Sequence, residues 1–129
     1  MNVIDSSVWL EYFADGPQSA AFASIVERPE MQIVPTITLY EVFKRVTQQR
    51  GENDALQSIA TMMQGAVVEL SPALALSAAR LSSQLRLPMA DSIILATARA
   101  YDAVLWSQDE HFAAIPGVRF VPKQGQRLS

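Results

Sequence analysis

The sequence predicts an α/β protein, a three-layer α/β/α sandwich with a mostly parallel central sheet. Two observations support this fold class. Short apolar runs typical of buried strands alternate with segments of helical periodicity, and these segments are long enough to serve as crossovers between parallel strands. The 129 residues, half of them hydrophobic, fall within the size of one domain. No linker, low-complexity tract or repeat divides the chain, so a single domain over residues 1–129 is expected.

The elements follow from these patterns in chain order. Strands are predicted at Asn2–Asp5, Gln32–Val34, Val67–Leu70, Ala103–Ser107 and, as the weakest pattern, Arg119–Val121. Helices are predicted at Val8–Phe13, Ser19–Glu27, Ile37–Gln49, Asp54–Met63, Ala73–Leu85 and Ala90–Tyr101, with a short one near Glu110–Ala113. Because ligands of such sheets bind at the carboxyl ends of the strands, polar residues that end the apolar runs are the first candidates for a site.

The composition excludes several kinds of site. Without cysteine the chain has no thiol nucleophile, thiolate zinc site or disulfide, and His111 is its single histidine. The lack of cysteine and of a secretory signal is typical of a cytoplasmic protein. The longest uncharged run, Ala55–Val68, is too short for a membrane helix of roughly 20 residues. The net charge of −3 gives no general attraction for nucleic acid, so a polyanionic substrate needs local bases or a bound divalent metal.

Four acidic side chains are candidates for a shared site. Asp5 and Asp109 end apolar runs, Asp91 opens an almost uniformly apolar helix, and Glu41 lies within another helix. Each also fits an ordinary structural role: the three aspartates as caps or turn residues, and Glu41 in a solvated pair with Arg45. Together they are more specific, because two strand ends and two helices can converge at one edge of a parallel sheet.

Converging carboxylates favour a hard cation. They repel one another unless they are protonated or bound to metal, and Mg²⁺ or Mn²⁺ prefers oxygen ligands while keeping water in its shell. A metal ion lowers the pKa of bound water and stabilises the charge that develops on a phosphoryl group. The four acids therefore predict a metal site suited to phosphodiester hydrolysis.

These residues resemble the pattern of the PIN-domain family, and the length and start of the chain resemble its VapC toxins. The pattern is an N-terminal strand that ends in Asp-Ser/Thr, a helical Glu, an Asp that opens a helix, and a strand end of the form Ser/Thr-x-Asp. The matching pieces, which run through the whole chain, are Val-Ile-Asp5-Ser-Ser-Val-Trp-Leu, Thr38-Leu-Tyr-Glu41-Val, Leu87-Pro-Met-Ala-Asp91-Ser-Ile-Ile-Leu-Ala-Thr-Ala and Leu105-Trp-Ser107-Gln-Asp109-Glu-His-Phe.

The resemblance implies a PIN-like fold and a metal-dependent endoribonuclease, the toxin of a type II toxin–antitoxin pair. Its implied cofactor is Mg²⁺ or Mn²⁺, its substrate RNA, and its partners a cognate VapB-like antitoxin and a second copy of the chain. The implied metal ligands, acting directly or through water, are Asp5, Glu41, Asp91 and Asp109. Ser7 and Ser107 are implied to be the hydroxyls that orient these ligands.

Two positions depart from the family pattern. Gln108 stands where relatives often carry a base, which puts a phosphate contact there in doubt, and Asp102 stands at a turn where a small residue is more usual. The helix face of Val8, Trp9, Tyr12 and Phe13 is expected to pack in the core, with an antitoxin-binding or dimer groove as the functional alternative. His111 is expected to be structural or exposed.

Other functions fit less well. An aspartyl-phosphate phosphatase needs a second aspartate two residues after the nucleophile, where this chain has Ser7, and a receiver domain needs a late lysine better placed than Lys123. A housekeeping PIN nuclease and a non-catalytic α/β interaction module remain alternatives. The basic residues are expected to lie mostly on solvated faces, with some of them near the cleft if RNA binds; they are Lys44, Arg45, Arg50, Arg80, Arg86 and Arg99.

Overall fold

Five parallel strands form the central sheet, in the order β3-β2-β1-β4-β5. The computed structural model describes residues 1–124. The strands are β1 (Asn2–Ile4), β2 (Gln32–Pro35), β3 (Ala66–Val68), β4 (Val104–Ser107) and β5 (Val118–Phe120). β1 lies at the centre, where Val3 is in register with Ile33 of β2 and Leu105 of β4. The predicted parallel sheet is confirmed, with small shifts at the strand ends.

Helices fill the connections between the strands, as predicted. The α-helices are α1 (Ser6–Phe13), α2 (Ser19–Val26), α3 (Thr36–Arg50), α4 (Glu52–Met62), α5 (Pro72–Leu85) and α6 (Met89–Ala100). Two short 3-10 helices are η1 (Pro29–Met31) and η2 (Glu110–Phe112). The sequence did not predict η1, because three residues are too few to show a periodic pattern. Within residues 1–124, no helix is both long and apolar enough to cross a membrane.

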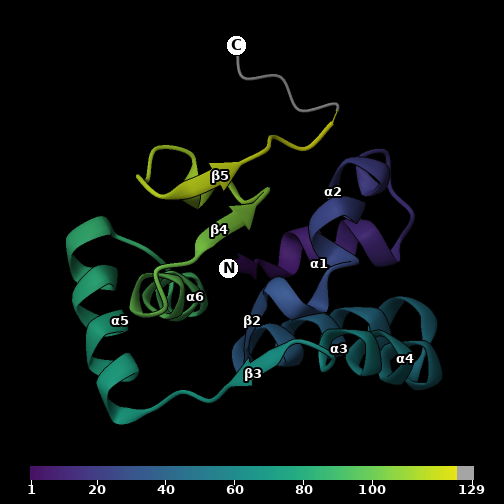
Figure 1. Ribbon diagram of the computed structural model, residues 1–129, viewed down its shortest axis with the longest axis horizontal. Coiled ribbons are helices and arrows are strands. Elements are labelled where there is room, and N and C mark those ends of the chain that lie inside the picture. The colour runs from purple at the N-terminus through teal and green to yellow at the C-terminus, as the bar shows by residue number, and fades with distance from the viewer. Residues whose placement is uncertain (125–129) are drawn as a thin grey trace.

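The helices form a layer on each side of the sheet, which confirms the three-layer sandwich (Figure 1). Successive side chains of a strand point to opposite faces, so β1 contributes to a hydrophobic core on each side of the sheet. Ile4 packs among buried residues of α1, α2, α3 and α4, whereas Val3 packs with Ile94 and Leu95 of α6. The first strand is therefore buried on both sides.

Helix α6 runs opposite to the strands and begins at the carboxyl edge of the sheet. Its eight residues from 91 to 98 are all buried, and the amide of Ala103, just before β4, donates to the Ala98 carbonyl at 2.8 Å. The first turn of α6, which contains Asp91, is thereby fixed at the edge where the strands end. The turn after α6 places the exposed Asp102 at φ 50°, which explains why a small residue is more usual there.

The aromatic face of α1 belongs mainly to the core. Trp9 is 1 % exposed and stacks on Phe13 with ring centroids 5.7 Å apart, while Tyr12 and Phe13 are half-buried. Core packing, the expected role, is confirmed for Trp9. The alternative of an exposed groove that includes Trp9 is wrong, because the indole is already enclosed by the core.

Candidate metal centre

The four acids predicted from the sequence line one cavity at the carboxyl edge of the sheet. The cavity has a volume of about 510 Å³ and is open to solvent. Asp5 comes from the end of β1, Glu41 from α3, Asp91 from the first turn of α6, and Asp109 from the loop after β4. The expected convergence of two strand ends and two helices is therefore present.

Asp5 is buried and is the best-anchored of the four acids. Its Oδ2 atom accepts hydrogen bonds from the Ser7 hydroxyl at 2.6 Å and the Ser107 hydroxyl at 2.9 Å. The Ser7 amide donates to the same oxygen at 3.4 Å, so Asp5 also caps α1. Burial raises the pKa of Asp5, the serine hydrogen bonds oppose this shift, and the charge of Asp109 adds to it.

Two serine hydroxyls join the ends of β1 and β4. Ser107 is fully buried, and its Oγ also accepts from the Asp109 amide at 2.9 Å. The Ser7 hydroxyl accepts from the Gln108 amide at 2.9 Å. Gln108 itself is 2 % exposed, so its side chain is enclosed rather than presented to a substrate. Ser7 and Ser107 thus lie where residues that orient the acids are expected.

Glu41 is half-buried and faces the cavity rather than a solvated helix surface. Its Oε1 accepts a short hydrogen bond from the Ser6 hydroxyl, which ties α3 to the start of α1. None of the ion pairs among the described residues joins Glu41 to Arg45, so that alternative is wrong. Burial raises the pKa of Glu41, and the charges of Asp5 and Asp109 raise it further against the Ser6 hydrogen bond.

Asp91 has a carboxyl group whose pKa is strongly raised. Burial, and then the charges of Asp109 and Asp5, raise its pKa to about 7, although its hydrogen bond to His111 opposes the shift. The side chain of Asp91 is 11 % exposed. A proton or a cation near this carboxylate therefore relieves an unfavourable concentration of negative charge.

His111 is part of the acid cluster, which sequence reasoning missed. Its Nδ1 atom lies 2.9 Å from Oδ2 of Asp91 and 3.0 Å from Oδ1 of Asp109. Burial opposes the charged imidazole, but the carboxylates of Asp109 and Asp91 outweigh it and raise the pKa of His111. The side chain is 55 % exposed, which agrees with the expectation of a structural or exposed residue, but its contacts with the two acids were not expected. Its one sequence signal was its place two residues after Asp109.

These donors fit a hard divalent cation. Asp91, Asp109 and His111 each offer a ligand atom within 4.8 Å of the others. Carboxylate oxygens with at most one imidazole nitrogen suit Mg²⁺ or Mn²⁺. Burial first, and then the charges of neighbouring acids, raise the pKa values of Asp5, Glu41 and Asp91, and a divalent cation would neutralise their negative charge.

The fold and the site together define a class of protein: an α/β/α sandwich that gathers carboxylates at the carboxyl edge of a parallel sheet. The chain belongs to the PIN domain family, whose model matches residues 3–118. This is a family of nucleases, as the sequence pattern implied. No curated protein sequence matches the chain.

Solved structures of toxin–antitoxin proteins have the same fold. A toxin–antitoxin complex from Klebsiella pneumoniae superposes with a TM-score of 0.77 at 23 % identity, covering 92 % of this chain and 96 % of that one. VapC20 of Mycobacterium tuberculosis, described as a toxin that cleaves the sarcin-ricin loop, gives 0.77 at 16 % identity, covering 94 % and 97 %. VapBC2 from Rickettsia felis, bound to promoter DNA, gives 0.72 at 14 % identity with coverage of 94 % and 97 %. The PIN fold shared with VapC-type toxins is therefore confirmed.

Proposed function

We propose that this protein is a Mg²⁺- or Mn²⁺-dependent endoribonuclease and the toxin of a type II toxin–antitoxin pair. The observation that carries the proposal is the convergence of Asp5, Glu41, Asp91 and Asp109 on one open cavity in a PIN fold. These acids hold the metal directly or through water. When bound, the ion supplies a water of lowered pKa and stabilises charge on the phosphoryl group.

The residues of the chain keep this site in position. The hydroxyls of Ser7 and Ser107 fix Oδ2 of Asp5, and the Ser6 hydroxyl fixes Glu41 across the cavity. The hydroxyl network also joins Asp109 to Ser107 through its amide. Held carboxylates lose little freedom when a cation binds, which favours binding.

The products distinguish this mechanism from attack by the ribose. Cleavage by activated water leaves a 5′-phosphate, whereas attack by the ribose 2′-hydroxyl leaves a 2′,3′-cyclic phosphate. The second route uses a pair of acid and base groups near the ribose, for which the chain has one imidazole, that of His111, and this imidazole contacts two acids.

Incubation of purified protein with RNA tests the proposal. We expect cleavage with Mg²⁺ or Mn²⁺, none in EDTA, and labelled fragments that end in 5′-phosphate. Restoring the metal after EDTA should restore cleavage, which controls for irreversible loss of the protein. Cleavage that persists in chelator, or cyclic phosphate ends, would contradict metal-activated water.

We propose further that a cognate antitoxin silences the protein in the cytoplasm. The solved neighbours that are toxin–antitoxin complexes support such a partner. A basic side chain of the antitoxin would enter the acid cluster in place of metal. Tyr12, Phe13 and two alanines of α2 line part of a separate cavity of about 500 Å³, and this part suits an apolar side chain of the same partner. The remaining lining residues are polar: Asp15, Ser19 and Glu27.

A homodimer is the proposed assembly of the toxin. Several apolar side chains on α5 and at the start of α6 are exposed, and such a surface favours association. They are Leu76 at 61 %, Leu85 at 38 % and Met89 at 72 % exposure.

A further inference from the structure

Helix α3 carries an exposed aromatic side chain at the rim of the acid cavity. Tyr40 precedes Glu41, lines the same cavity, and is 60 % exposed. Val42 and Val46 of the same helix are buried and bind α3 to the core, so the helix does not need Tyr40 for packing. A large exposed aromatic side chain beside a site is available to a ligand.

Basic side chains line the cavity together with Tyr40. The Nζ atom of Lys44 lies 5.8 Å from the centroid of the Tyr40 ring, and Arg45 and Lys123 line the same cavity. None of the three belongs to an ion pair among residues 1–124, so their charges are free for an anion. The cavity thus has buried acids, Asp5 and Asp91, at its floor. Exposed basic side chains and an aromatic ring lie at its rim.

This rim combines the two features of sites for single-stranded nucleic acid. Aromatic rings stack on bases, and neighbouring cations bind the phosphates of the backbone. In a duplex both faces of a base are covered by its neighbours, so only an unpaired nucleotide can stack on a protein ring.

We propose that Tyr40 stacks on an unpaired base of the RNA substrate while Lys44 and Arg45 bind the adjoining phosphates. The proposal rests on the proposed ribonuclease function and adds to it the residues that bind an unpaired nucleotide next to the acids. Tyr40 is then a substrate-binding residue that helps position the chain so that a neighbouring phosphate meets the acids. The same rim explains how a protein with net charge −3 attracts RNA.

The experiment measures RNA binding under conditions in which the RNA is not cleaved. The probe is a fluorescein-labelled 12-nucleotide oligoadenylate, single-stranded or annealed to its complement, and anisotropy is followed in EDTA so that no hydrolysis occurs. Base–aromatic stacking contributes about 1–3 kcal/mol by alanine substitution, so Tyr40→Ala should weaken single-strand binding by roughly 5- to 150-fold. Tyr40→Phe should bind like the parent, and both variants should bind the duplex as the parent does.

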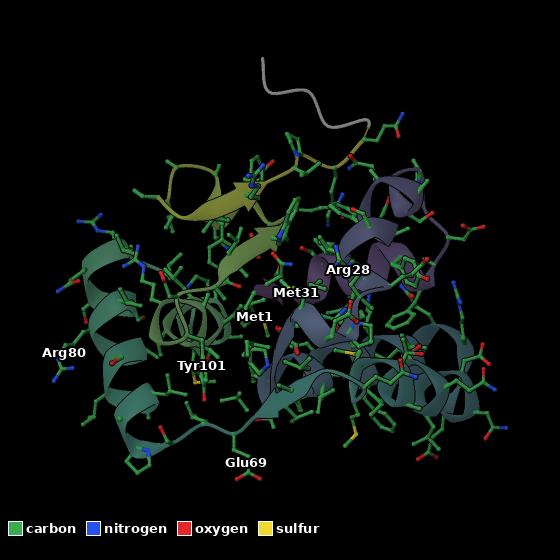
Figure 2. All side chains as sticks on the ribbon, viewed as in Figure 1. Met1, Arg28, Met31, Glu69, Arg80 and Tyr101 are labelled. Atoms are coloured by element: carbon green, nitrogen blue, oxygen red, sulfur yellow. The ribbon has the colours of Figure 1, made fainter. Side chains whose placement is uncertain are left out.

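Matched controls lie elsewhere on the chain. Tyr101 is 46 % exposed and is labelled in Figure 2. It follows the last residue of α6, whereas Asp91 lies in the first turn of that helix, so Tyr101→Ala should leave binding unchanged. Arg80 points outward from α5, away from the sheet, so Arg80→Gln is the control for Lys44→Gln (Figure 2). Lys44→Gln should weaken binding and reduce its salt dependence.

Each outcome decides the proposal. A loss of single-strand binding without a loss of duplex binding in Tyr40→Ala supports stacking. Tyr40→Leu, which keeps an apolar side chain but has no ring, should lose as much single-strand binding as Tyr40→Ala. Equal binding by Tyr40→Ala and the parent, equal losses for single strand and duplex, or no binding of the probe by the parent would overturn it. Because no metal is present, this result is independent of the cleavage experiment that tests the ribonuclease function.

Discussion

Asp5 caps a helix, as one of the two interpretations of the sequence required, and it also lines the acid cavity, as the other required. It caps α1 through the Ser7 amide at 3.4 Å, but its closer contacts are the two serine hydroxyls at 2.6 and 2.9 Å. The cap is therefore a weak hydrogen bond, and the two serine hydroxyls hold the carboxylate more closely than the amide does. A residue can end a strand, start a helix and still present a ligand oxygen, because a carboxylate accepts several hydrogen bonds.

Removing the charge of Asp91 should stabilise the metal-free protein. The folded pKa of Asp91 is about 7 against 3.8 for the unfolded chain. The parent therefore loses stability as pH rises from about 4 to about 7, and the loss is complete above that range. Asp91→Asn removes it, so its free energy of unfolding in EDTA at pH 8 should exceed that of the parent by roughly 2–4 kcal/mol. Urea denaturation at pH 4 and pH 8 measures the difference, which should be small at pH 4.

The control separates this site from surface charge in general. Glu69→Gln removes an exposed acid that points away from the sheet, and its stability should follow that of the parent at both pH values (Figure 2). Saturating Mg²⁺ should raise the stability of the parent more than that of Asp91→Asn, because the ion binds the folded parent. A lower stability of Asp91→Asn at pH 8 in EDTA would mean that Asp91 is a structural cap.

The acids of the site were predictable from the sequence, but their partners were not. Asp5 and Asp109 follow apolar runs, and the topology of a parallel sheet brings such positions together. Ser6 and His111 gave no comparable signal. Their contacts with Glu41 and Asp91 join residues 35 and 20 positions apart, and they depend on how α3 and α6 dock against the sheet.

At the level of elements, the turn between α3 and α4 depends on one glycine. Gly51 ends α3 and precedes α4 with φ 97° and ψ 169°, a conformation almost restricted to glycine. A Cβ added there would meet no atom within 4 Å, so strain comes from the backbone alone. Gly51→Ala should therefore lower the free energy of unfolding by about 1–3 kcal/mol in urea denaturation.

Two further measurements check that the loss of stability comes from backbone strain at Gly51. Asn53→Ala, an exposed substitution in the first turn of α4, should change stability by a few tenths of a kcal/mol at most. RNA cleavage by Gly51→Ala should match the parent below the melting temperature, since the turn lies ten residues beyond Glu41 in α3. Unchanged stability of Gly51→Ala would show that the turn adopts another conformation at no cost.

The elements that the sequence located best are those with long patterns. Helix α6 has an uninterrupted apolar run, and its observed start and end differ by one residue from those predicted. β3 and β5 have three residues each and contain exposed or half-exposed side chains, so a burial pattern was weak or absent. Helix η1 had no pattern at all, because its shape depends on Pro29 and local turn geometry.

At the scale of the whole molecule, toxicity is the property that tests the proposed biological role. Expression of the chain alone should arrest bacterial growth, and Asp91→Asn at the same soluble level should not. Co-expression with the product of an adjacent small gene should restore growth, since the antitoxin would occupy the acid cluster. Growth rate and protein level are the measurements. Normal growth with the soluble parent chain would favour a housekeeping PIN nuclease or a non-catalytic module.

The position of β1 has a consequence for synthesis of the protein. The first strand lies between β2 and β4, and the oxygen of Asp5 bonds to a serine 102 residues later in the chain. A ribosome that has made only α1 to α6 has made a polypeptide without β4, Ser107 or Asp109. Such a chain lacks one acid and the strand that anchors another. A truncated or stalled translation product therefore carries no complete acid cluster. Any activity that needs all four acids can begin only after β4 and Asp109 have been translated.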